Sequence, residues 1–131
     1  MAKLVAVRLQ RDIEALLASR KPLAKGTRAI SASYFTRPLE KDQAPLLFLV
    51  HAAKRGIPNS PDRNKQKRRM REALRTLSIY DVVEQQLIDR SQQVLVHLRT
   101  TKPPSRQVSW EVILADMETI GKRLQEVLAR A

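Results

Sequence analysis

The sequence contains no cysteine and only two histidines among its 131 residues. The lack of cysteine excludes disulfides, thiolate catalysis and cysteine-bound metal sites, and it favours a reducing, cytoplasmic setting. The longest apolar run, in the segment APLLFLV, is too short to span a membrane. The opening segment MAKLVAVRLQRD has neither a long apolar stretch nor a small-residue cleavage pattern, so we expect no signal peptide.

Sequence motifs for catalysis are also missing. The chain has no G-x-S-x-G pattern, no phosphate-binding P-loop, no H-E-x-x-H zinc motif and no pair of carboxylates spaced for acid–base chemistry. No carboxylate near His51 or His97 has the spacing of a metal site, so we interpret both histidines as structural or incidental. We therefore predict no catalytic residue and no metal ligand in this chain.

Positive charge is what the sequence has in excess. Its 25 Lys and Arg residues against 13 Asp and Glu give a net charge of +12. Nine basic residues minus two acidic ones place +7 of this charge between residues 54 and 75. Basicity kept for solubility would be spread over the surface, whereas a cluster indicates an anionic partner, most often nucleic acid.

Hydrophobic periodicity predicts one α+β domain over residues 1–131, with helices packed on one small sheet as a two-layer α-β sandwich. The expected helices cover residues 8–19, 63–77, 81–89 and from about 109 onward, and the expected strands cover 29–36, 46–51 and 92–100. Asp62 and Ser109 are expected to cap the second and the last of the four helices. The last helix should bury one stripe: Trp110, Ile113, Met117, Ile120, Leu124 and Leu128.

The segment DRNKQKRRMREAL, residues 62–74, predicts a helix with two stripes. At about 100° per residue, the apolar stripe consists of Met70, Ala73, Leu74 and Leu77. The neighbouring stripe is polar and cationic and consists of Arg63 at its edge, Asn64, Lys67, Arg68, Arg71 and Arg75. Lys65 and Arg69 point further round the helix. Lys67, Arg71 and Arg75 follow one another at i, i+4, where like charges repel, which indicates a polyanion in front of them.

Three further residues leave two interpretations open. Tyr34 and Phe35 point to opposite faces of a strand, so one should enter the core and the other is open to a ligand. An aromatic side chain on a sheet beside a basic helix can stack on an unpaired base. The alternative is that both aromatics only pack within the protein. Asn64 fits either a fixed polar contact to the polyanion or simple helix initiation.

Residues 54–74, KRGIPNSPDRNKQKRRMREAL, resemble the signature region of the bacterial ribonuclease P protein component. That family carries a basic pair, here Lys54 and Arg55, then a short gap and the run R-N-x-x-K-R-x-x-R-E. The defining positions of this run are occupied by Arg63, Asn64, Lys67, Arg68, Arg71 and Glu72. The third position of the run, usually Arg, is Lys65, which keeps the charge and loses the bidentate fork of Arg.

The resemblance covers nearly the whole chain, although only the motif is specific. The segment RLQRDIEALLASRK is similar to the family's first helix, AISASYF to its first long strand, and VLVHLR with SWEVILADMETIGKRLQEVL to its last strand and helix. In the first helix, Ile13 and Leu17 stand where the family often has phenylalanines lining a cleft. This departure shifts the expected base stacking toward Tyr34.

The resemblance implies a fold and a function. The fold has an unusual left-handed β-α-β crossover around the motif helix, whereas the general expectation is right-handed. The chain would be a monomeric RNA-binding subunit of the ribonucleoprotein endonuclease of tRNA 5′ maturation, with no membrane partner. The ribonuclease P RNA would bind at Lys54, Arg55, Arg63, Asn64, Lys65, Lys67, Arg68, Arg71 and Arg75. A cleft with Tyr34, Phe35, Ile13 and Leu17 would hold the precursor tRNA leader.

The same resemblance assigns the chemistry to the RNA, which uses magnesium ions, and predicts no ion tightly bound by this chain. The protein would raise the affinity for the precursor tRNA and lower the magnesium requirement. The residues themselves leave an alternative open, which is a stand-alone basic RNA-binding or ribosome-associated protein with no role in cleavage.

Overall fold

A computed structural model describes residues 5–7, 9–24, 29–52, 60–100 and 109–130. Its elements in chain order are β1 (Val5–Ala6), α1 (Gln10–Ser19), β2 (Lys21–Ala24), β3 (Ile30–Pro38), β4 (Leu46–His51), α2 (Ser60–Thr76), α3 (Ile79–Asp89), β5 (Gln92–Thr100) and α4 (Trp110–Arg130). The four helices and three strands predicted from periodicity are present. The short strands β1 and β2 are additional, and neither is long enough to show a strand period in the sequence.

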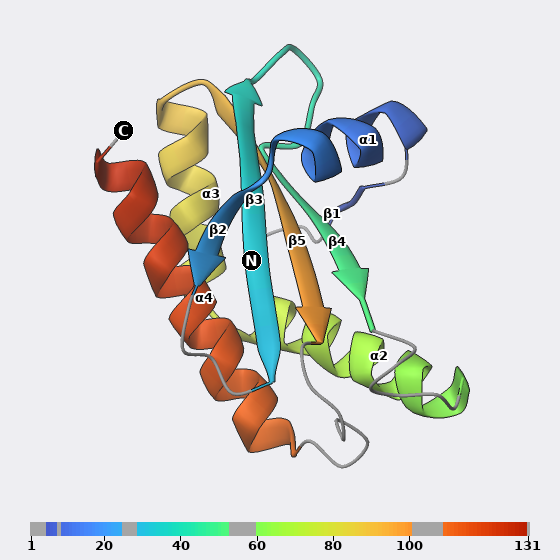
Figure 1. Ribbon diagram of the computed structural model, residues 1–131. Coiled ribbons are helices and arrows are strands. Elements are labelled where there is room, and N and C mark those ends of the chain that lie inside the picture. Colours follow the sequence, from blue (N-terminus) through green and yellow to red (C-terminus); the bar gives the residue numbers. More distant parts are fainter. Residues whose placement is uncertain (1–4, 8, 25–28, 53–59, 101–108, 131) are drawn as a thin grey trace.

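The strands form one mixed sheet in the order β1-β4-β5-β3-β2 (Figure 1). β5 lies at its centre, antiparallel to β3 and parallel to β4. The outer strand β2 pairs antiparallel with β3, and β1 pairs parallel with β4. This arrangement confirms the predicted α+β class and its small central sheet.

The connection from β4 to β5 is the unusual feature of this topology. The chain leaves β4, passes through α2 and α3 on one face of the sheet and returns into β5, the parallel neighbour of β4 (Figure 1). The crossover is left-handed, opposite to the hand that the twist of strands and helices normally imposes. The hand implied by the family resemblance is therefore confirmed.

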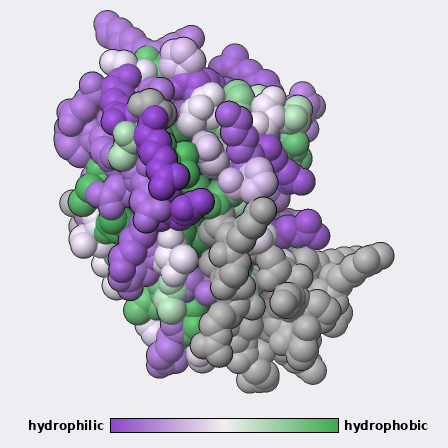
Figure 2. Space-filling view, turned by 60° about the vertical axis from the view of Figure 1, so that its left-hand side comes forward, coloured by the Kyte–Doolittle hydropathy of each residue, from purple (hydrophilic) through white to green (hydrophobic). Residues whose placement is uncertain are grey.

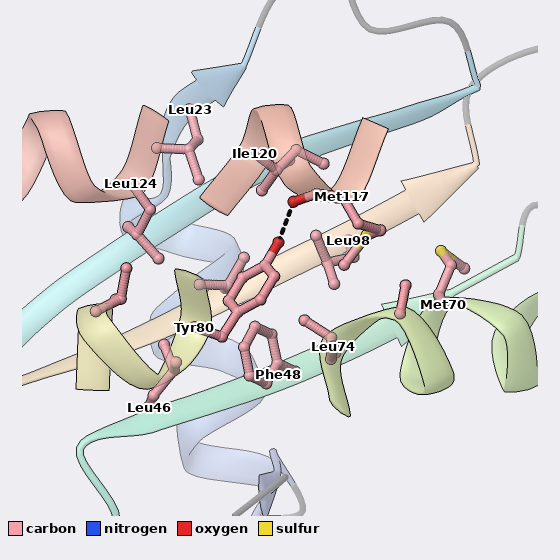
Figure 3. Packing of buried hydrophobic residues seen from close by; sticks show 14 of the residues in the cluster. Leu23, Leu46, Phe48, Met70, Leu74, Tyr80, Leu98, Met117, Ile120 and Leu124 are labelled. Atoms are coloured by element: carbon pink, nitrogen blue, oxygen red, sulfur yellow. Dashed lines mark hydrogen bonds between the residues drawn. The ribbon is translucent and has the colours of Figure 1, made fainter. Parts of the chain in front are cut away.

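The main hydrophobic core lies between this face and the helices α2, α3 and α4. Its residues from the sheet alternate along each strand, as Phe48 on β4 and Leu98 on β5 illustrate. Tyr80 of α3 stands in the middle of the core (Figure 3), its ring edge-on to Phe48 with centroids 5.8 Å apart. Its hydroxyl donates a hydrogen bond of 2.5 Å to the Met117 carbonyl oxygen, so the one polar atom of this ring is satisfied.

The predicted stripe of α4 is confirmed, because its five aliphatic side chains are fully buried and Trp110 packs against the same core. The Ser109 hydroxyl accepts a hydrogen bond from the Val112 amide at 3.3 Å, as expected of a helix cap. The prediction for Asp62 is wrong, because α2 begins at Ser60 and Asp62 lies inside its first turn. Pro61 fits there, since a helix start does not need its missing N–H.

The outer surface beside this core is mainly hydrophilic. Figure 2 brings forward the side of the molecule on which α3 and α4 lie, and polar side chains cover most of its coloured area. Within the described part of the chain, no helix combines the length and the apolar character that a membrane crossing requires.

Candidate nucleic-acid interface

Helix α2 is fixed to the sheet by its apolar stripe. Met70, Ala73 and Leu74 are buried in the main core, and Leu77 packs against it. Gln66 is also buried, with 2% of its surface exposed, although its polarity kept it out of the predicted stripe. Since one side of α2 is held in the core, the rotation of the helix is fixed and the opposite side faces solvent.

That opposite side carries the cations, and we call it the α2 surface. Its exposed members are Asn64, Lys65, Arg68, Arg71 and Arg75, and the half-buried ones are Arg63 and Lys67. Glu72 pairs with Arg75 at 3.3 Å, and both side chains are about half exposed, so this pair offsets little of the charge. Lys54 and Arg55 lie outside the described residues, so their predicted place beside this surface stays a prediction.

A second surface lies on the other face of the sheet, where α1 is the one helix among the described residues (Figure 1). Leu16 of α1 is fully buried there against Leu95 of β5, with Ile13, Phe35 and Leu47 packed around them. Leu95 pairs with Phe35 on one side and Leu47 on the other. α1 therefore covers one apolar row across three strands.

Beyond the end of α1 the same face becomes polar. The next two rows along the sheet are Ser33–His97–Leu49 and Ser31–Arg99–His51. They form the floor of an open hollow, here called the sheet groove, lined by Leu17, Arg20, Leu49, His51, His97 and Arg99. A neighbouring hollow over Pro22, Ser31 and Ser33 shares Arg20, His97 and Arg99 with it, so the groove continues across the sheet.

The two histidines lie close together in this groove, which no motif or spacing in the sequence indicates. Their ring centroids are 6.2 Å apart, and an Arg20 guanidinium nitrogen lies 3.2 Å from Nδ1 of His97. Burial, followed by the charges of Arg20, His51 and Arg99, lowers the pKa of His97 to about 4. Burial, Arg99 and Lys67 also lower the pKa of His51. Both histidines are therefore neutral near pH 7.

Lys67 connects the two surfaces. It lies on α2, yet its charge acts on His51 at the end of β4. The cationic side of α2 and the sheet groove are consequently neighbours at this edge of the molecule. The helical period of the sequence could not show this, because it places residues around α2 and says nothing about β4.

The four residues predicted for the leader cleft have separate positions. Leu17 lines the sheet groove and is 45% exposed. Phe35 lies on the α1 face and packs beside Leu95. It also lines a small hollow together with Tyr34, Lys21 and Thr36. Ile13 packs in the apolar row under α1.

Tyr34, which the expectation had favoured for stacking, is partly buried and also lines this small hollow. Its side chain packs against the main core on the helix-covered face, opposite to Phe35. The reason is the strand register, since Tyr34 pairs with the buried Val96, whereas Phe35 pairs with Leu95 beneath α1.

A polar network holds α1 in place over the sheet. Arg37 of β3 donates a hydrogen bond of 2.9 Å from Nη2 to the buried Asp12 carboxylate in the first turn of α1. Its Nε donates to Oε1 of Gln93 at 2.6 Å, and the Gln93 amide donates to the Ala44 carbonyl. Arg37 thereby links α1 to β5 and fixes one wall of the α1 face.

Solved structures share this architecture. The RNase P protein of Staphylococcus aureus superposes with a TM-score of 0.61 at 16% identity, over 92% of this chain and 94% of that one. The fold is that of the RNase P proteins. The Thermotoga maritima RNase P protein gives 0.54 at 18% identity over 96% of both chains. A mutant of the S. aureus protein with defective mRNA degradation activity gives 0.62 at 14% identity, over 92% of this chain and 87% of that one.

No protein-family model and no curated protein sequence matches this chain. The likeness to these structures therefore rests on the course of the backbone.

Proposed function

We propose that this chain is the protein subunit of a ribonuclease P, which binds the catalytic RNA and assists removal of the 5′ leader from precursor tRNA. One observation carries the proposal. The run R-N-x-x-K-R-x-x-R-E, already indicative in the sequence, lies on the solvent-facing side of α2 in a chain with the RNase P protein fold.

The α2 surface would bind the ribonuclease P RNA. Asn64, Arg68 and Arg71 are exposed on a helix whose rotation is set by the core, so they present a fixed pattern of donors. Phosphate contacts from such a row would make binding depend strongly on salt.

The sheet groove and the α1 face would take the leader. A single strand offers unpaired bases and a phosphate backbone, and the groove offers the apolar Leu17 and Leu49 beside the cations Arg20 and Arg99. Phe35, on the same face, replaces Tyr34 as the aromatic candidate for contact with a base.

Catalysis would belong to the RNA and its magnesium ions. Among the described residues, no three His, Asp or Glu side chains lie together as ligands for an ion. Both surfaces present cations, which repel Mg²⁺. This chain would supply affinity and orientation for the substrate.

Functional reconstitution tests the proposal. The protein is added at low magnesium to several bacterial ribonuclease P RNAs together with a precursor tRNA, and leader removal is measured. We expect stimulation of cleavage with at least one of these RNAs. If the protein binds RNA but stimulates none of them, the stand-alone RNA-binding function is favoured.

Substitution along α2 tests which side binds the RNA. Arg68→Gln or Arg71→Gln should weaken binding and reduce its salt dependence by about one phosphate contact. Arg69→Gln is the matched control, because Arg69 lies further round the helix and is half-buried. Equal losses at all three positions would contradict the one-sided model and indicate diffuse electrostatic binding.

A further inference from the structure

The sheet groove concentrates four ionisable side chains in a way that the proposed function does not by itself require. His97, Arg99 and His51 occupy adjacent positions on β5 and β4, and Arg20 follows α1 directly. The two rings lie 6.2 Å apart, and all four side chains line one open hollow. The charge of Lys67 on α2 also acts on His51.

These cations have no partner of opposite charge in the part of the chain that the structure describes. The ion pairs there are Asp12–Arg37, Glu72–Arg75, Glu118–Lys122 and Glu126–Arg123, and none of them includes Arg20 or Arg99. Arg20 instead donates to a neutral imidazole. A guanidinium that faces His97 and no carboxylate is ready to bind an anion from outside.

We propose that Arg20, His51, His97 and Arg99 form a phosphate-binding subsite that takes up a proton when a phosphodiester of single-stranded RNA enters the groove. This inference rests on the proposed function, because it concerns the leader that the groove would hold. It adds a property that neither the fold nor the motif implies, which is a leader affinity that rises as the pH falls.

The hydrogen bond from Arg20 to His97 determines where the proton goes. Nδ1 of His97 accepts from the guanidinium, so the ring proton of the neutral imidazole lies on Nε2. An entering phosphate competes for the donors of Arg20 and frees Nδ1. This nitrogen then takes a proton from the solvent, and the imidazolium adds a charge-assisted hydrogen bond to the phosphate.

Burial and the surrounding cations explain why the proton is absent before RNA binds. They hold the pKa of His97 at about 4, and a phosphate beside the ring removes part of that repulsion. A pKa that is higher in the complex than in the free protein makes binding tighter as the pH falls between the two values. Each proton taken up strengthens binding by up to about tenfold per pH unit.

Calorimetry with a single-stranded oligouridylate tests the inference, since uracil does not titrate in this range. The full chain is titrated at constant ionic strength from about pH 7 to about pH 5.5, in buffers of different ionisation enthalpy that reveal proton uptake. We expect uptake approaching one proton per strand and an affinity that rises severalfold toward low pH. Histidine NMR signals, with and without the oligouridylate, should show protonation of His97 only in the complex.

Histidine variants identify the residue that takes up the proton. His97 and His51 are the only histidines, so the double variant His51→Gln/His97→Gln should bind with no proton uptake in this range. His51→Gln keeps the protein testable if the buried His97 does not tolerate substitution, because His97 is then the only histidine and its NMR signal reports the proton directly. The uptake should persist in this variant, since His51 is one of the groups that lower the pKa of His97. Lys122→Gln on α4 is the matched control, and both affinity and uptake should stay unchanged there.

The outcomes separate this inference from the proposed function. Binding without proton uptake, or uptake that persists in the double variant, would overturn the inference and leave the leader-binding groove intact. If the oligouridylate does not bind at any pH and the holoenzyme treats substrates with and without a leader alike, the proposed leader binding itself fails.

Discussion

The two faces of one sheet follow opposite designs. On the helix-covered face, Val94, Val96 and Leu98 of β5 point into a dry core beneath α2, α3 and α4. On the α1 face, the intervening Leu95, His97 and Arg99 pass from apolar to charged along the same strand. Alternation of side chains on one strand thus separates a surface that stabilises the fold from the surface that we propose binds RNA.

The difference between the two faces shows where this basic protein places its charge. Burial of an unpaired cation is costly, and the β5 side chains buried beneath the helices include the apolar Val94, Val96 and Leu98. The charged rows remain where a single short helix leaves the sheet open. The groove therefore lies where α1 leaves the sheet open, whereas the α2 surface is the solvent-facing side of a helix whose other side is buried in the core.

Neighbouring residues on opposite faces provide the sharpest test of this comparison. Leu98→Ala should lower the free energy of unfolding by about 2–5 kcal/mol, because it removes a fully buried side chain from the core. Arg99→Gln, one residue further, should change it by less than about 0.5 kcal/mol and weaken RNA binding instead. Urea unfolding and RNA titrations measure the two effects. A large loss of stability in Arg99→Gln would break the division between the faces.

A second prediction tests how closely the helices pack over the covered face. A Cβ atom at Gly121 of α4 would lie 2.6 Å from Cγ2 of Ile79 and 3.2 Å from Cζ of Tyr80. Gly121→Ala should therefore destabilise the protein by about 1–3 kcal/mol, although alanine normally favours a helix over glycine.

A double-mutant cycle identifies the cause of that loss. Ile79→Ala makes room for the new methyl group, so adding it to Gly121→Ala should cost less than it does in the parent chain. Thermal unfolding of the four proteins supplies the comparison. Additive losses would show that the close contact between α3 and α4 does not limit this position.

A third prediction concerns the attachment of α1. Asp12→Ala removes the acceptor of Arg37 and should lower the stability by about 1–2 kcal/mol, because a partly buried guanidinium loses its partner. Glu14→Ala, on the exposed side of the same helix, is the control and should have little effect. Hydrogen exchange at the α1 amides should accelerate in Asp12→Ala only. Equal exchange rates in the two variants would mean that packing alone holds α1.

Much of the covered face could be predicted from the sequence. The stripes of α2 and α4 follow from a period of 3.6, which also places Gln66 on the buried side of α2 if polarity is set aside. The start of α2 was harder to predict than its stripes, because proline occurs both in loops and in the first turn of helices, and Pro61 fits either. The left-handed crossover depends on contacts between distant segments, so it was available only from the family resemblance.

Most of the groove could not be predicted from the sequence. Alternation separates His97 from Val96 and Leu98, so its place on the other face could be deduced. Its neighbours could not, because Arg20 and His51 reach it through the strand register and the end of α1. Tyr34 and Phe35 show the same limit, since alternation puts them on opposite faces and only the register decides which face is the core.

The last prediction is a dependence of stability on pH to which His97, on the open face, contributes. The pKa of His97 is lowered to about 4 in the folded protein, so the unfolded chain binds more protons between about pH 6.5 and this value. Stability should fall as the pH drops through this window, by at most about 1.4 kcal/mol per pH unit from this residue. His97→Gln should flatten that slope, whereas His51→Gln, an exposed position, should change it less. Urea unfolding at several pH values measures it, and an unchanged slope in His97→Gln would assign the dependence to other groups.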